Sequence, residues 1–384
     1  MPLRRIAGSA PDAEHWCLPW LKHWNHAQVM VLLAATDTAA IPGISAAGAT
    51  AASRRATAAA DAELLLLGPE RPRPHALPPL PAGVSPALIS HVVLQELGLS
   101  PLLVDLGCPV APAVAHLRLP LRWGGGPARC LSRGQAMDPG RVKALMAVGH
   151  RWGSALARGR VHRPLVLTEC VPGGTSTAQA VLTALGLEVE GLVSGSLREP
   201  AHRRKAALVE RGMAASDLVA PVEPRRALAA LGDPMQALAA SLLLALAGSG
   251  VPVLLAGGSQ MAAVLALALA LAPPPLRQPL AADVAIGTTA WVAAEPSSDL
   301  SLLLERIGAR WQVAPLAFAA DLRFDADLHK ALADYERGFV KEGVGAGGLA
   351  LLWQLSGRSP EVLARRCDRA CHQLLADDLR SAHG

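Results

Sequence analysis

PLVLTECVPGGTSTAQAVLTALG, residues 164–186, is the segment that most clearly indicates a fold. Its first five residues form an apolar run typical of a buried strand. Residues 178–185 form a good helix, which Gly186 closes. A polar, glycine-rich turn, residues 169–177, lies between the two. A strand, a tight turn and a helix in this order are typical of the units that build a parallel α/β sheet.

The same pattern occurs at two other places in the chain. The apolar run at residues 28–35 leads into polar residues 36–38, and the run at residues 251–256 leads into a Gly-Gly-Ser-Gln turn. Repetition at several strand ends indicates one sheet whose carboxyl edge carries backbone donors and hydroxyls. The predicted fold class is therefore α/β, with a Rossmann-like parallel sheet flanked by helices.

Composition supports this class and excludes others. The chain has 384 residues, of which 51% are hydrophobic and only 3% aromatic. A core of Ala, Leu and Val suits helices packed on a sheet better than an all-β sandwich, and it excludes a disordered chain. The net charge of +5 comes from scattered arginines, so we expect no nucleic-acid partner. Six dispersed cysteines and no apolar leader indicate reduced thiols and a cytoplasmic location.

Three further segments allow predictions about the membrane, the N-terminus and metal binding. Residues 234–276 carry no charge, but Gly and Pro cut them into pieces too short for a membrane span, so we expect no membrane partner. The first 28 residues are predicted to form an amphipathic helix that docks by Trp16, Trp20 and Trp24. Cys367 and Cys371 lack a second ligand pair, so no metal site is predicted there.

The glycine-rich turn is a candidate anion site. Backbone N–H groups of Gly173, Gly174 and Thr175 lie at a predicted helix N-terminus, where unpaired donors and the helix dipole favour a phosphate. The hydroxyl of Ser176 adds a donor. An ordinary βα turn is the alternative, because a lone Gly-Gly turn is a weak signal. Further candidate donors are Lys205, Gly257, Gly258 and Ser259.

A carboxylate near the C-terminus stands among glycines. In the run KEGVGAGG, residues 341–348, Glu342 is followed by four glycines. Glycine is costly in a helix interior, so this density indicates a special backbone path or a close approach to a ligand. Glu342 is a candidate base, with an exposed loop carboxylate as the alternative.

Five blocks, in order along the chain, resemble one family. The resemblance is to the nicotinate-nucleotide:dimethylbenzimidazole phosphoribosyltransferases, in the branch found in cyanobacteria and archaea. The blocks are ATDTAAIPGISAAGAT (35–50), ECVPGGTSTA (169–178), GDPMQ (232–236), AGGSQM (256–261) and KEGVGAGG (341–348).

The resemblance implies an architecture and a reaction. It implies one catalytic unit over residues 1–384, with the sheet domain at about 85–330. A smaller helical domain with base-pocket segments would come from the chain ends, 1–84 and 331–384, and the protein would be a homodimer. The substrates would be nicotinate mononucleotide and a benzimidazole-type base, in the assembly of the cobalamin lower ligand. No cofactor or metal is expected.

The resemblance also implies roles for individual residues. Glu342 would take the proton of the benzimidazole N–H, and Glu169 would be the second carboxylate. The 5′-phosphate would be held by Gly173, Gly174, Thr175 and Lys205. The base pocket is assigned to Asp37 and Ser45.

Two other functions remain open at this stage. A non-catalytic protein that binds a nucleotide or a cobamide precursor would need the same cavity. An oxidoreductase that uses a nicotinamide cofactor is disfavoured, because no dinucleotide fingerprint follows any predicted strand.

Overall fold

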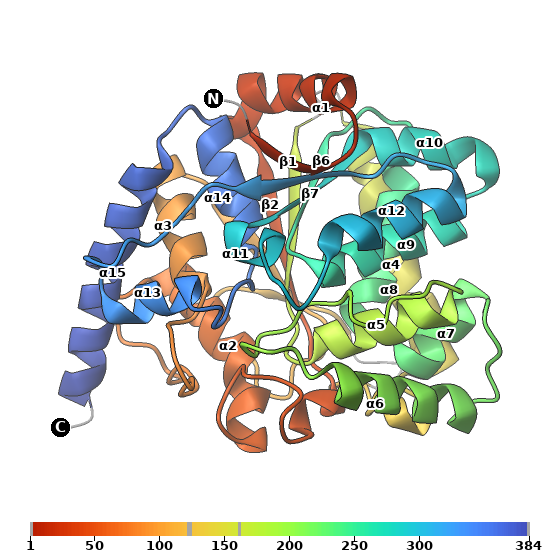
Figure 1. Ribbon diagram of the computed structural model, residues 1–384, viewed down its shortest axis with the longest axis horizontal. Coiled ribbons are helices and arrows are strands. Elements are labelled where there is room, and N and C mark those ends of the chain that lie inside the picture. Colours follow the sequence, from red (N-terminus) through yellow and green to blue (C-terminus); the bar gives the residue numbers. More distant parts are fainter. Residues whose placement is uncertain (1–2, 121–124, 160–162, 382–384) are drawn as a thin grey trace.

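A computed structural model describes residues 3–120, 125–159 and 163–381. These residues form an eight-stranded sheet with helices on both faces (Figure 1). In chain order, the strands are β1 (Arg4–Ala7), β2 (Gln28–Leu33), β3 (Pro101–Asp105), β4 (Leu117–Arg118), β5 (Leu165–Cys170), β6 (Val253–Ala256), β7 (Val284–Thr289) and β8 (Leu316–Ala320).

The order of the strands creates a switch point inside the sheet. The spatial order is β1-β8-β7-β6-β5-β2-β3-β4. From β2 the chain runs outward through β3 and β4, then returns to β5 on the other side of β2 and continues to β8. All strand pairs between β8 and β4 are parallel, which confirms the predicted sheet. In open α/β sheets, ligands bind outside the carboxyl ends of the strands where the order reverses.

Two layers of helices enclose two apolar cores (Figure 1). One face carries α1 (Ala10–His23), α2 (Ala51–Leu67), α3 (Ala87–Leu97), α13 (Lys330–Glu336), α14 (Ala346–Leu355) and α15 (Pro360–Ser381). The other carries α4 (Pro139–Ala157), α5 (Gly174–Ala184), α8 (Pro234–Leu246), α9 (Ser259–Leu271), α10 (Pro274–Asp283) and α12 (Leu300–Trp311). The remaining helices are α6 (His202–Ala215) and α7 (Pro224–Leu231), which pack on α5, and the short α11 (Ala290–Ala293) after β7.

The uncharged segment predicted as helix, strand and helix is α8, β6 and α9, at the centre of the protein. Nearly every side chain of α9 is buried, so the helix is apolar all round. No helix among the described residues combines the length and apolar character needed to cross a bilayer.

The N-terminus departs from its prediction in one respect. The predicted helix is present as α1, and Trp16 and Trp20 are buried against the sheet. Residues 4–7, however, form β1, which pairs antiparallel with the edge strand β8. A four-residue strand with two arginines has no alternating pattern, and its partner lies more than 300 residues away in the chain. Local sequence therefore contained no signal for it.

The sheet also crosses the predicted domain boundary at residue 85. Both β1 and β2 come from residues 1–84, and β2 lies in the interior of the sheet. The chain-end helices α1, α14 and α15 share one core cluster with that face of the sheet. The division into a larger and a smaller domain stays a prediction, and the N-terminal segment contributes to both parts.

Close packing of α4 on α8 gives a stability prediction. A Cβ placed on Gly149 would lie 2.2 Å from the carbonyl oxygen of Leu238. We expect Gly149→Val to lower the free energy of unfolding by about 1–3 kcal/mol, since the helices must separate. The control is Ala147→Val, at an exposed position of the same helix. Urea unfolding measures both, and equal stabilities would contradict the packing argument.

Candidate active site

A cavity of about 530 Å³ lies at the carboxyl ends of β5 and β6, beside the switch point. Its volume is in the usual range for a small-molecule site. Residues 169–175, which span the end of β5 and the turn after it, line the cavity, as do residues 258–260 after β6. The other lining segments are residues 45–47, 77–86, 194–199 and 339–344, with Thr57, Asp61, Val292, Leu374 and Leu375.

Glu342 enters this cavity from the loop between α13 and α14. Its Oε1 accepts hydrogen bonds from the backbone N–H groups of Gly343 (3.1 Å) and Gly347 (3.0 Å). Its Oε2 accepts from the Thr288 hydroxyl (3.0 Å) and the Thr289 N–H (3.1 Å). Burial raises the pKa of Glu342 to about 7, and these four donors oppose the rise. The carboxyl group is therefore held in one orientation and exchanges its proton near neutral pH.

The backbone around Glu342 explains why glycine is dense there. Val340, Lys341 and Val344 all have positive φ, between 51° and 64°, which costs free energy in residues with a side chain. A Cβ on Gly347 would lie 2.1 Å from the Thr288 carbonyl carbon and 2.5 Å from Oε2 of Glu342. Only glycine lets the first turn of α14 approach β7 closely enough to donate to the carboxylate.

Glu169, the penultimate residue of β5, is the second carboxyl group in the cavity. Its Oε2 accepts from the Val171 N–H (2.7 Å) and its Oε1 from Nε2 of Gln260 (2.9 Å). Burial raises the pKa of Glu169 to about 8; the Val171 amide opposes this, and the charges of Asp233 and Glu342 add to it. Glu169 is thus mainly protonated at neutral pH.

The interaction between Glu169 and Glu342 gives the cavity its electrostatic character. Each negative charge makes the other costlier, because both are removed from water. A positive charge formed in the cavity would relieve this repulsion and favour both carboxylates in their ionised forms. The arrangement is suited to a reaction that develops positive charge on its substrate.

Two helices begin at this cavity. The first residues of α5 and α9, Gly174 and Ser259, both line it, so the positive ends of two helix dipoles meet there. Part of the first turn is already bonded internally, since the Gly174 N–H donates to Val171 and the Ser176 N–H to Gly173. The anion-binding capacity therefore rests on the remaining amides of both helices and on the side chain of Thr175.

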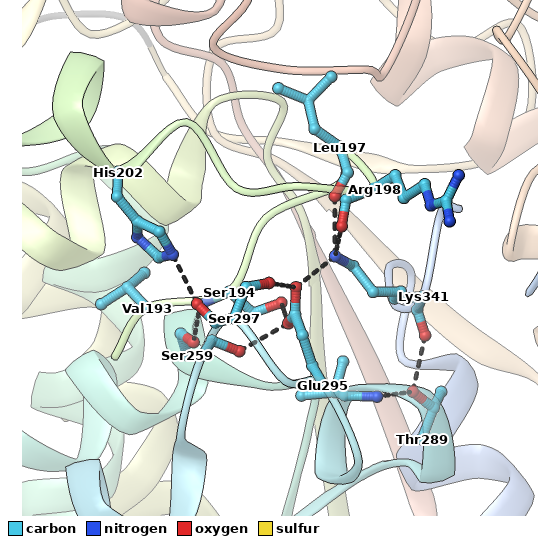
Figure 2. A network of polar contacts seen from close by, with 12 residues as sticks. Val193, Ser194, Leu197, Arg198, His202, Ser259, Thr289, Glu295, Ser297 and Lys341 are labelled. Carbon is cyan, nitrogen blue, oxygen red and sulfur yellow. Dashed lines mark hydrogen bonds and ion pairs between the residues drawn. The ribbon is translucent and has the colours of Figure 1, made fainter. Parts of the chain in front are cut away.

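A buried ion pair fastens the loop that carries Glu342 (Figure 2). The Lys341 ammonium lies 2.5 Å from Oε1 of Glu295 and donates to the Leu197 carbonyl (2.8 Å). Glu295 also accepts from the hydroxyls of Ser194 and Ser298. The network thus joins three loops around the cavity, at residues 194–198, 295–298 and 339–344.

Lys205 contacts the same network through the backbone of residues 193 and 194. It is fully buried on α6, and its ammonium donates to the carbonyls of Ser194 (2.6 Å) and Val193 (3.4 Å). Burial lowers the pKa of Lys205 to about 7; the charge of Glu295 opposes this, and that of Lys341 adds to it. In this structure Lys205 holds the backbone of the 193–195 turn.

The cavity brings together most of the residues predicted for the site. Eight of the twelve line it: Ser45, Glu169, Gly173, Gly174, Thr175, Gly258, Ser259 and Glu342.

The other four predicted residues do not line the cavity, so their proposed contacts with a ligand stay predictions. Ser176 is buried inside α5, and Lys205 lies behind the 193–195 turn. The Gly257 N–H is occupied by the Gly287 carbonyl (2.9 Å). Asp37 opens the short helix η2 (Asp37–Ala40) and lines a separate small hollow. The assignment of Asp37 to the base pocket therefore stays a prediction, and the structure places its side chain at that separate hollow.

Sequence reasoning missed three groups at this site. Gln260 orients Glu169, and its Oε1 has no hydrogen-bond partner among the described residues. Asp61 lines the cavity from α2, and Glu295 pairs with Lys341. Gln260 lies within the quoted AGGSQM block, but the other two carry no local motif. The described residues contain no group of three or more His, Cys, Asp or Glu side chains that could hold a metal ion.

Comparison with known proteins identifies relatives of this chain. Residues 89–285 match a family described as phosphoribosyltransferase. The chain is 53% identical over 368 residues to a UPF0284 protein of Parasynechococcus marenigrum strain WH8102, covering 94% of this chain and 91% of that protein. It is 46% identical over 343 residues to a UPF0284 protein of Gloeobacter violaceus, covering 89% and 86%.

A solved structure shares the fold. It is that of the nicotinate-nucleotide-dimethylbenzimidazole phosphoribosyltransferase of Thermus thermophilus, with a TM-score of 0.57 and 20% identity, covering 95% of this chain and 92% of that one. The α/β fold and the family predicted from the five blocks are confirmed. The chain belongs to this phosphoribosyltransferase family.

The raised pKa of Glu169 predicts a pH-dependent stability. Between its usual 4.5 and about 8, the folded protein keeps a proton that the unfolded chain has lost, so the free energy of unfolding falls as pH rises through this interval. Glu169→Gln removes that dependence. At 1.36 kcal/mol for each pH unit, the variant should gain up to about 4 kcal/mol on the wild type from pH 5 to pH 8.

Urea unfolding at several pH values measures this difference. Glu305→Gln, on the exposed face of α12, is the matched control and should follow the wild type throughout. A constant difference between Glu169→Gln and the wild type across this range would contradict the assigned protonation state.

The buried ion pair gives a separate prediction. Lys341→Met or Glu295→Gln alone should lower the free energy of unfolding by about 3–5 kcal/mol, because each leaves an unpaired buried charge. The double variant should recover much of that loss. A double-mutant cycle by chemical unfolding measures the coupling, and strictly additive losses would show that the two groups do not interact.

Proposed function

We propose that the protein transfers the 5-phosphoribosyl group of nicotinate mononucleotide to a nitrogen of a benzimidazole-type base and releases nicotinate, in the assembly of the cobalamin lower ligand. One observation carries the proposal: a buried carboxyl group, Glu169, and a partly buried one, Glu342, line one cavity together with the starts of two helices. The family and the name of the Thermus thermophilus protein that shares the fold support it. We expect a homodimer in the cytoplasm.

Nicotinate is a good leaving group, so the protein does not need to supply a strong acid to it. Nicotinate leaves as a neutral pyridine ring, since the electrons of the broken glycosidic bond neutralise its positively charged nitrogen. The benzimidazole nitrogen forms the new bond to the anomeric carbon and becomes positively charged. A base must then take the proton from the N–H of the same imidazole ring.

Glu342 is the proposed base. Its four donors hold the carboxylate in place, and its pKa of about 7 keeps a useful fraction ionised at neutral pH. Because these donors stabilise the carboxylate, they favour its return to the ionised form after proton transfer. A carboxylate in this position both attracts the charge that forms on the ring and removes the proton.

Glu169 is the proposed stabiliser of the sugar. The anomeric carbon becomes oxocarbenium-like as the glycosidic bond breaks, and a nearby carboxylate lowers the free energy of that state. The positively charged pyridinium ring of the bound nucleotide would favour the ionised form of Glu169, whose pKa burial raises to about 8. The starts of α5 and α9 are the proposed site of the 5′-phosphate, which would position the sugar.

The decisive experiment is an assay of the purified protein with nicotinate mononucleotide and dimethylbenzimidazole, followed by the mass of the product. We expect Glu342→Gln to lower kcat by about 10²–10⁴-fold, because the amide has hydrogen-bonding shape but no basicity. Glu305→Gln should retain full activity.

Two outcomes would reject parts of the proposal. Full turnover by Glu342→Gln would reject Glu342 as the base. Tight binding of nicotinate mononucleotide without turnover of any acceptor would reject transfer and favour a non-catalytic binding protein.

A further inference from the structure

The cavity contains a third buried carboxyl group that the proposed chemistry does not use. Asp61, in the middle of α2, is only 6% exposed and lines the cavity together with Thr57, one turn earlier on the same helix. Most of the lining around it is apolar. The neighbouring lining residues include Leu77, Pro78, Val84, Pro86, Leu374 and Leu375.

Asp61 has hydrogen-bonding capacity left over. Its Oδ1 accepts from the Ser85 hydroxyl at 2.6 Å. Among the residues that the structure describes, its Oδ2 accepts only from the Cys170 thiol, a weak donor, at 3.4 Å. Burial raises the pKa of Asp61 to about 6, and both donors oppose the rise. The group is therefore mainly ionised at neutral pH, and a buried charge of this kind is costly unless further donors reach it.

Asp61 lies at the end of the cavity where Glu342 is held. Its partner Ser85 precedes Pro86, and a Cβ on Gly343 would lie 2.9 Å from Cγ of Pro86. The Ser90 hydroxyl on α3 donates to the Val344 carbonyl at 2.9 Å, which fixes α3 against the Glu342 loop. A base bound at Glu342 would therefore lie beside the segment that holds Asp61, in the cavity that both residues line.

The segment that carries Ser85 is firmly placed. The Tyr335 hydroxyl donates to the Val84 carbonyl (2.8 Å), and the Gly83 N–H donates to Asp334 (2.9 Å), both from α13. Ser85 therefore holds the carboxylate of Asp61 in one orientation. Its Oδ2 atom accepts one weak hydrogen bond, from the Cys170 thiol.

We propose that Asp61 selects the acceptor base by accepting a hydrogen bond from an amino or hydroxyl group on the ring edge remote from the reacting nitrogen. This rests on the proposed function and refines its substrate class: the preferred acceptor is an aromatic nitrogen base with such a donor, and a base with only alkyl groups there is a poorer substrate. A site built around a buried hydrogen-bonding group discriminates strongly against ligands that leave the group unpaired.

A series of acceptors on one ring tests this directly. The wild type is assayed with nicotinate mononucleotide and benzimidazole, 5,6-dimethylbenzimidazole, 5-aminobenzimidazole or 5-hydroxybenzimidazole. We expect kcat/KM for the amino or hydroxyl compound to exceed that for the dimethyl compound by about ten- to hundredfold. Comparison of kcat/KM for the amino and hydroxyl compounds shows which of the two groups the site prefers.

Asp61→Leu should abolish or reverse this preference while KM for nicotinate mononucleotide stays unchanged. If the Leu variant does not fold, Asp61→Asn should reduce the preference at least threefold, because its amide oxygen is a weaker acceptor. Glu305→Gln is the matched control and should keep the wild-type preference. Equal or better use of the dimethyl compound by the wild type, or an unchanged preference in the Asp61 variants, would overturn the proposal.

Calorimetric binding of the same four bases separates this proposal from the proposed function. If no base is converted but the donor-bearing bases bind more tightly and lose that advantage in Asp61→Leu, the transfer reaction fails and base recognition by Asp61 stands. If no base is converted and none of the four is bound preferentially, both proposals fail.

Discussion

The approach of α14 to the ends of β6 and β7 is the constraint that makes the site possible. Gly347 and Gly348 allow this contact, because a side chain at either position would collide with the strands. At that distance the first turn of α14 donates to Glu342 from one side while the end of β7 donates from the other. A helix packed about one ångström further out would leave the carboxylate without the α14 donor, because hydrogen bonds weaken steeply with distance.

The cost of this arrangement appears in the charges around the cavity. Glu169 and Asp61 are buried and Glu342 is partly buried, and the loss of contact with water raises the pKa of each carboxyl group. Glu169 and Glu342 are kept in place largely by backbone N–H groups at the ends of strands or the starts of helices, where such groups lack helical partners. The same geometry that makes the ionised forms of these carboxyl groups costly favours a ligand that carries or develops positive charge near them.

The ion pair between Lys341 and Glu295 gives the strained loop its anchor. Positive φ angles at Val340, Lys341 and Val344 store unfavourable conformational energy next to Glu342. The buried pair, with the Leu197 carbonyl, compensates for that strain and ties the loop to two others (Figure 2). The loop is thereby rigid without regular secondary structure, which suits a base that must meet its proton at one position.

The parallel sheet, the glycine-rich turn after β5 and the unusual backbone path around Glu342 could all be predicted from the amino-acid sequence. Each has a local signature: an apolar run, a strand–turn–helix order, or glycines around a carboxylate. Other features became visible only in the folded chain. The edge strand β1, the position of Lys205 behind the cavity wall and the entry of Asp61 into the cavity all depend on contacts between distant segments. Periodicity and turn chemistry are properties of neighbouring residues, whereas burial and charge pairing arise only when the packed chain excludes water.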